Sequence, residues 1–186
     1  VGGPDGKPCV LFVHGSSMAS QPTFDLVVPG RPDSSVMDWF ARRGFECWCV
    51  DMEGYGRSDK TRPINSDIAD GADDLAAASA YIMEKTGSGP LLVYGISSGA
   101  LRGAMFAERH PDRVARLALD AYVWTGEGSP TLEQRRRKLP EFLKSNRRPI
   151  DRAFVHSIFE RDHPDCADRR TVDAFADAIL ALDDSM

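Results

Sequence analysis

Cysteine is scarce in this chain, and its four positions match neither a disulfide framework nor a metal-binding motif. Cys9, Cys47, Cys49 and Cys166 have neither the density of a disulfide scaffold nor the paired spacing of a zinc site. Three of them lie in strand-like apolar runs, which favours reduced cysteines in a core. The cysteines therefore argue against a disulfide-stapled module, and we expect no metal.

Long apolar runs and an excess of one charge are also missing. No run approaches the roughly 20 apolar residues that a membrane helix needs. The 23 basic and 28 acidic residues are intermixed, with a net charge of −5, so we expect neither a membrane nor a nucleic acid as partner. The sequence contains no signal-peptide pattern, internal repeat or low-complexity segment, and since it opens at Val1 without methionine a leader could have been removed. Cytoplasmic is the default localisation.

The chain does contain an alternation of short apolar runs and helical patterns. Apolar runs at 9–13, 45–50, 91–93 and 115–123 are separated by helical patterns that include 34–44, 66–86 and the stretch up to His110. This order predicts an α/β fold with a mostly parallel sheet and helices on both faces. Ligands bind beyond the carboxyl ends of such strands. Four polar residues lie there: His14, Asp51, Ser97 and Asp120.

Residues 95–99, Gly-Ile-Ser-Ser-Gly, join one of these strands to a helix and have the pattern of a nucleophile elbow. A serine hydroxyl becomes a useful nucleophile when a strained strand-to-helix turn presents it to a base. Gly95 and Gly99 flank Ser97 at both second-neighbour positions, whereas Ser98 lacks that symmetry. We therefore predict Ser97 as the nucleophile, and the amide of Ser98 as an oxyanion donor at the helix start.

A second oxyanion donor is predicted after the first strand. His14-Gly15 ends that strand, and a backbone amide just after the glycine can face a reacting carbonyl. Ser16 is the first choice for that amide and Ser17 the second. His14 itself is interpreted as a structural histidine. The loop at 51–59 lacks the ending of a phosphate-binding loop and is interpreted as structural.

From residue 126 the pattern is helical only, with helices expected at 131–145, 149–161 and 168–184. The chain therefore divides into a core at 1–125 and a helical lid at 126–186, which would cover the crevice. Trp124, which leads into the lid, is a candidate to bind the apolar part of a substrate. Basic runs at 135–138 and 147–148 are interpreted as solvated helix faces.

Three motifs together resemble the α/β-hydrolase fold. They are His14-Gly15 after one strand, Asp51-x-x-Gly54-x-Gly56-x-Ser58 after the next, and Gly95-x-Ser97-x-Gly99 after the third. The helical insertion resembles that fold's lid. The resemblance implies Ser97 as nucleophile, the amides of Ser16 and Ser98 as oxyanion hole, and no metal or organic cofactor. The resemblance runs from about the third of the family's eight strands to the end of its lid.

The chain departs from that family in its acid and base. The family's order is serine, then acid, then histidine, with the last two after its seventh and eighth strands, and neither strand is present. Asp120 is the nearest candidate acid in this sequence, and a carboxylate in the missing part is the alternative, which the family's order favours. We expect the catalytic histidine in a missing C-terminal segment or a second chain. The predicted function is hydrolysis of an ester or related acyl bond of a small, partly hydrophobic substrate. A carbon–carbon bond hydrolase and a non-catalytic ligand-binding protein are the alternatives.

Overall fold

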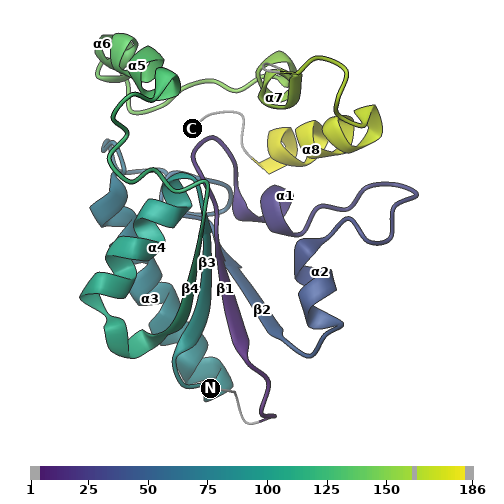
Figure 1. Ribbon diagram of the computed structural model, residues 1–186, viewed down its shortest axis with the longest axis vertical. Coiled ribbons are helices and arrows are strands. Elements are labelled where there is room, and N and C mark those ends of the chain that lie inside the picture. The colour runs from purple at the N-terminus through teal and green to yellow at the C-terminus, as the bar shows by residue number, and fades with distance from the viewer. Residues whose placement is uncertain (1–4, 161–162, 183–186) are drawn as a thin grey trace.

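A four-stranded parallel sheet forms the centre of the molecule (Figure 1). The computed structural model describes residues 5–160 and 163–182. The strands are β1 (Cys9–Val13), β2 (Glu46–Val50), β3 (Leu91–Ile96) and β4 (Val114–Asp120), in the spatial order β2-β1-β3-β4. All three strand pairings are parallel. The predicted α/β fold with a parallel sheet is confirmed.

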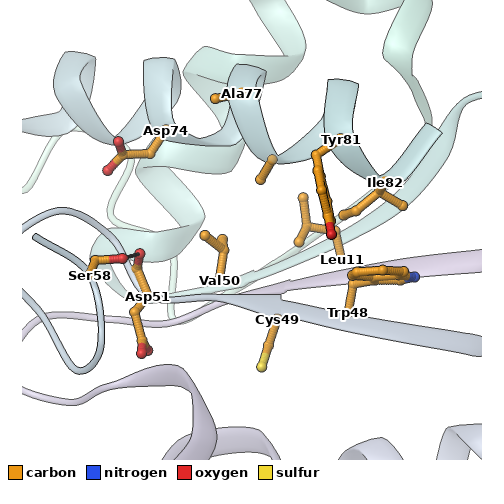
Figure 2. Close-up of a pocket in the computed structure, with 11 residues that line it drawn as sticks. Leu11, Trp48, Cys49, Val50, Asp51, Ser58, Asp74, Ala77, Tyr81 and Ile82 are labelled. Atoms are coloured by element: carbon orange, nitrogen blue, oxygen red, sulfur yellow. Dashed lines mark hydrogen bonds between the residues drawn. The ribbon is translucent and has the colours of Figure 1, made fainter. Parts of the chain in front are cut away.

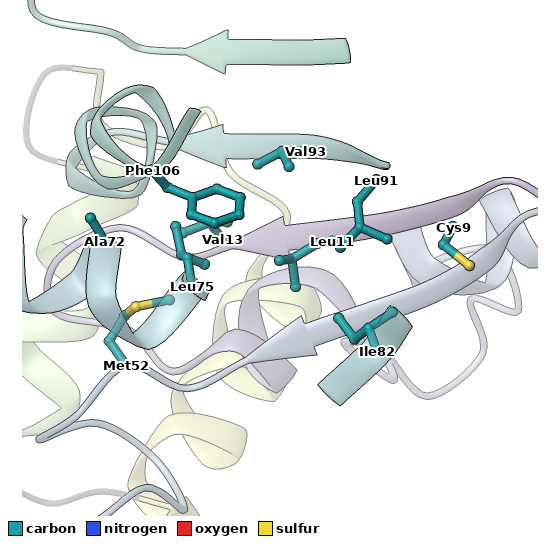
Figure 3. Close-up of a cluster of buried hydrophobic side chains, with 10 residues drawn as sticks. All are labelled: Cys9, Leu11, Val13, Met52, Ala72, Leu75, Ile82, Leu91, Val93 and Phe106. Carbon is teal, nitrogen blue, oxygen red and sulfur yellow. The ribbon is translucent and has the colours of Figure 1, made fainter. Parts of the chain in front are cut away.

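Helices α3 (Ile68–Thr86) and α4 (Ser98–Arg109) cover one face of the sheet. Figure 3 shows their side chains meeting those of β1 and β3, with Leu75 and Phe106 fully buried against Leu11 and Val93. Each fully buried side chain of this size stabilises the fold by about 1.5–3 kcal/mol. This packing fixes α4 against the strand that precedes it.

The opposite face is covered by α1 (Ser20–Phe24) and α2 (Val36–Ala41). Val10 and Phe12 point to this side and pack with Phe24. Every residue of β1 is buried, as expected for a central strand covered on both faces. Ser35 caps α2, because its hydroxyl accepts a hydrogen bond from the Asp38 amide.

Three predicted boundaries need correction. The last strand was expected to reach Val123, but β4 ends at Asp120 because Ala121 has a φ of 47°, outside the extended region. β4 is an edge strand, with Leu117 and Leu119 each 37% exposed. The second strand begins at Glu46 rather than at residue 45. The helix predicted at 66–86 is observed from Ile68, after a capping box formed by Asp67.

Four helices follow β4 in the described part of the chain, one more than the sequence predicted. They are α5 (Pro130–Arg137), α6 (Leu139–Phe142), α7 (Arg152–Glu160) and α8 (Arg169–Leu182). The expected helix at 131–145 is divided at Lys138, the residue between α5 and α6. The predicted helix ends at 161 and 184 lie outside the described residues.

Helices α5–α8 lie beyond the carboxyl ends of the strands (Figure 1). α7 and α8 share a buried cluster with the segment after α1, in which Val155 and Ile179 are fully buried beside Val28. No helix in the described ranges is long and apolar enough to cross a membrane. The four cysteines carry free thiols, and Cys9 is buried in β1.

Candidate active site

Ser97 lies at the turn between β3 and α4 in a strained backbone conformation. Its φ of 57° and ψ of −121° are unusual for a residue with a side chain and cost about 1–3 kcal/mol. Backbone hydrogen bonds on both sides of Ser97 keep it in this strained conformation. The Ser97 N–H donates to the Asp120 carbonyl at 2.9 Å, and the Ser97 carbonyl accepts from the Ala100 amide at 3.0 Å. The elbow conformation predicted from the sequence is therefore present.

Glycines allow the backbone segments around Ser97 to approach closely. A methyl carbon added at Gly95 would lie 2.5 Å from the Gly99 carbonyl oxygen, and one added at Gly99 would lie 2.3 Å from the Val13 carbonyl oxygen. One added at Gly15 would lie 3.1 Å from Ser97 Cβ. Side chains at these positions would push β1, the elbow and α4 apart.

The loop after β1 passes beside the elbow. Ser16 Oγ donates to Ser98 Oγ at 2.9 Å, which ties this loop to the first turn of α4. Within residues 5–160 and 163–182, neither the Ser16 nor the Ser98 backbone N–H makes a hydrogen bond. Ser17, the second choice for the oxyanion amide, has a φ of 72°. The structure thus brings the two predicted oxyanion residues together beside Ser97.

His14 is a buried structural residue, as predicted. Its Nδ1 lies 2.7 Å from the Gly15 carbonyl oxygen, and its Nε2 accepts from the Met52 amide at 3.0 Å. Burial lowers the pKa of His14 to about 4, against the opposing effect of the Gly15 hydrogen bond. The imidazole is therefore neutral at pH 7, with both nitrogens occupied, and it links the end of β1 to the end of β2.

Asp51 organises the loop after β2. Its carboxylate accepts hydrogen bonds from the Ser20 amide and hydroxyl and from the Arg57 amide. Burial favours the protonated carboxyl, but the bonds from Arg57 and Ser20 outweigh it and lower the pKa of Asp51. These contacts are all internal to the protein, in agreement with the structural interpretation of residues 51–59.

Asp120, the candidate acid, lies at the end of β4, in register with Ile96. The Tyr94 hydroxyl donates to its Oδ2 at 2.5 Å. Burial, with the hydrogen bond to Asp120, raises the pKa of Tyr94 to about 12. Sequence reasoning missed Tyr94, although the two-residue alternation of β3 places Tyr94 and Ile96 on the same face.

The four histidines are all among the described residues, and none hydrogen-bonds to the Ser97 hydroxyl. His110 ends α4, its ring 5.5 Å from that of Phe106. His156 Nε2 on α7 lies 3.1 Å from Asp173 Oδ1 on α8. The described chain thus places no histidine in hydrogen-bond contact with Ser97, the predicted nucleophile.

A cleft of about 650 Å³ separates the core from the segment that includes α5 and α6. Ser16, Ser17 and Tyr55 line its core side, and Phe142, Leu143 and Arg148 line the other side. Trp124 lines neither this cleft nor the cavity along β2 and is 84% exposed, with its ring 6.3 Å from that of Tyr122. Its predicted role in substrate binding stays a prediction.

A second cavity, of about 460 Å³, lies along β2 (Figure 2). Trp48 of β2 faces Tyr81 of α3 across it, and Asp74 lies toward the end that holds Ser58. Burial raises the pKa of Asp74, partly offset by the hydrogen bond from the Glu53 amide. Neither cavity is lined by residues 95–99, but the 650 Å³ cleft is lined by Ser16, whose hydroxyl bonds to that of Ser98 beside the elbow. That cleft is therefore the candidate substrate site.

Comparison with known proteins identifies the class to which this fold and elbow belong. Residues 8–163 match the model of the alpha/beta hydrolase fold family, and the chain belongs to that family. An extracellular alpha/beta-hydrolase from a Paenibacillus species has a similar structure, with a TM-score of 0.64 and 14% identity over 92% of this chain and 65% of that one. At this identity the likeness concerns the fold alone.

Two curated relatives are more similar in sequence. Proline iminopeptidase of Neisseria meningitidis is 28% identical over 178 residues, which cover 89% of this chain and 52% of the relative. Pimeloyl-[acyl-carrier protein] methyl ester esterase of Neisseria meningitidis is 31% identical over 118 residues, or 63% of this chain and 38% of the relative. The chain thus spans about half the length, or less, of these two relatives.

Proposed function

We propose that Ser97 is the nucleophile of a serine hydrolase that cleaves a carboxylic ester or related acyl bond. The observation that carries the proposal is the strained elbow, which a protein retains only where its surroundings enforce it. In the proposed reaction the Ser97 hydroxyl attacks the acyl carbon and forms an acyl-enzyme, which water then hydrolyses.

The oxyanion hole is formed, in this proposal, by the amides of Ser16 and Ser98. Two observations support it: both N–H groups lack a partner in the described chain, and the two side chains are joined by a 2.9 Å hydrogen bond. In other enzymes, removal of one such donor lowers turnover by about 10²–10³-fold. The start of α4 adds a favourable field for the developing negative charge.

The base is proposed to come from polypeptide outside this sequence, either a further segment or a second chain. No described histidine contacts Ser97, and a hydroxyl without a base is a weak nucleophile. Asp120 is proposed as the acid that orients that histidine. Its carboxylate has one described donor, Tyr94, and retains lone pairs for an imidazole N–H.

Helices α5–α8 are proposed to act as a lid, because the candidate cleft lies between their segment and the loop that contains Ser16. The relatives' names indicate ester and peptide substrates for those proteins. We propose an ester for this chain, and Phe142 and Leu143 in the cleft support a partly hydrophobic one.

A fluorophosphonate probe and a p-nitrophenyl ester test the nucleophile. We expect the native protein, isolated with any chain that accompanies it, to be labelled on Ser97 and to hydrolyse the ester. Ser97→Ala should abolish labelling and lower turnover about 10⁴-fold or more, since the nucleophile acts as one unit with its base.

Ser98→Ala is the matched control, because Ser98 is adjacent and contributes its amide rather than its hydroxyl. It should keep the label. If a natively folded protein is neither labelled nor active, the proposal is wrong and the non-catalytic ligand-binding alternative takes its place. An intact mass of 20.4 kDa with full activity would contradict the proposed external base.

A further inference from the structure

The segment between α6 and α7 lines the candidate cleft and carries two arginines, one of which reaches the loop that contains Ser16 and Ser17. Arg147 donates to the Lys60 carbonyl, and Arg148 donates to the Ser17 hydroxyl. Ser17 is two residues from Gly15, the residue that lies against Ser97 Cβ. Arg148 therefore lines the cleft together with Ser16 and Ser17, in the loop that is bonded to the first turn of α4.

Arg148 is held in place without an acidic partner. Its guanidinium carbon lies 4.7 Å from the centre of the Phe154 ring, an arrangement that favours a cation over the ring face. No carboxylate among the described residues forms an ion pair with Arg148 or Arg147. Arg148 is half-buried, so its solvation is partly lost. The interpretation of 147–148 as a solvated helix face is wrong, since the segment is not helical.

The other charges of the cleft do not neutralise these arginines. Glu53 is paired with Arg62, and Asp59 accepts hydrogen bonds from its own turn at Thr61. Lys60, with Arg135 on α5 and Glu141 on α6, completes the charged lining, so five basic and three acidic side chains line the cleft. Arg147 and Arg148 thus leave an excess of positive charge in a cleft that is otherwise partly apolar.

We propose that Arg148 determines substrate specificity by binding a carboxylate on the acyl part of the substrate. A guanidinium fixed by Phe154 and Ser17 keeps N–H donors in a planar arrangement that fits a carboxylate. The preferred substrate is then a half-ester of a short dicarboxylic acid, with its carboxylate at Arg148 and its ester carbon at Ser97. This inference rests on the proposed function and adds the chemical class of the substrate.

Binding of two matched esters tests the assignment without any need for turnover. Monomethyl glutarate carries a carboxylate where methyl valerate has a methyl group. We expect Ser97→Ala protein to bind the anionic ester at least tenfold more tightly at low salt, measured by calorimetry. The preference should fall as salt is raised, since solvent ions screen a partly exposed charge pair.

Variants in the Ser97→Ala background identify the residue responsible. Arg148→Gln should bring the two affinities within twofold, and Arg148→Lys should restore part of the preference. Arg136→Gln, which removes an exposed arginine of α5 outside the cleft lining, should leave the preference unchanged. Circular dichroism checks that each variant is folded.

Equal affinity for the two esters, no detectable binding of monomethyl glutarate, or a preference that survives Arg148→Gln would each overturn the inference. Hydrolysis of a neutral p-nitrophenyl ester and labelling of Ser97 report on the nucleophile independently. Intact hydrolysis without an anionic preference therefore refutes the role of Arg148 alone, whereas unlabelled Ser97 refutes the proposed function itself.

Discussion

Replacing Gly99 by alanine tests whether close packing of α4 against β1 is what holds the elbow in place. Helix propensity favours the alanine by at most about 1 kcal/mol. The added methyl carbon would lie 2.3 Å from the Val13 carbonyl oxygen and 2.4 Å from that of His14. These are backbone atoms at the end of a paired strand, so they cannot rotate away as a side chain could. Overpacking of this kind costs about 3 kcal/mol, the upper end of the usual range.

The clash should therefore outweigh propensity, and we expect Gly99→Ala to lower the free energy of unfolding by about 2 kcal/mol. Urea denaturation followed by circular dichroism measures it. Gly103→Ala on the same helix is the control, since its nearest neighbours would be Val93 Cγ1 at 3.6 Å and Leu117 Cδ1 at 3.7 Å, an ordinary contact. That variant should be unchanged or up to about 1 kcal/mol more stable. A Gly99→Ala protein as stable as the wild type would refute the packing argument.

Two further predictions concern buried polar groups. Because the folded pKa of His14 is lowered to about 4, the unfolded chain binds more protons below the ordinary value of 6.5, and stability is lost as pH falls through that window. We expect the His14 contribution to cost about 2 kcal/mol between pH 7 and 5. His14→Gln should remove this slope, and an unchanged slope would contradict the assignment. Tyr94→Phe should lower the free energy of unfolding by about 1 kcal/mol through loss of the bond to Asp120. It should also remove the phenolate absorbance step near pH 12, whose persistence would show that another tyrosine is responsible.

The strands and the elbow could be predicted because their signals are local. Each of the three strands β1–β3 is a short apolar run beside a turn, and the glycines at 95 and 99 permit the contacts that the elbow needs. The end of β4 could not be placed, because Tyr122 and Val123 have strand propensity while the positive φ of Ala121 ends the strand. Propensity does not report such a tertiary constraint.

The contacts of Arg148 were out of reach of sequence reasoning for a different reason. Arg148 and Ser17 are 131 positions apart, and no periodicity relates them. A basic pair in a polar stretch has the same appearance whether it is solvated or lies against a cleft. The Tyr94–Asp120 pair, across 26 positions, depends likewise on the register of β3 and β4. Long-range polar contacts of this kind become visible only once the topology is known.

The geometry of Ser97 is maintained by groups that lie within the described chain. Its amide and carbonyl are bonded to Asp120 and Ala100, and Gly15 and Gly99 keep β1 against it. None of these contacts involves a histidine, so the position of the nucleophile does not depend on the base. A general base typically contributes about 10²–10⁴ to the rate, separately from the oxyanion donors. The geometry of the proposed nucleophile and oxyanion hole therefore depends on this sheet and its first loop, and the proposed external base would add proton transfer.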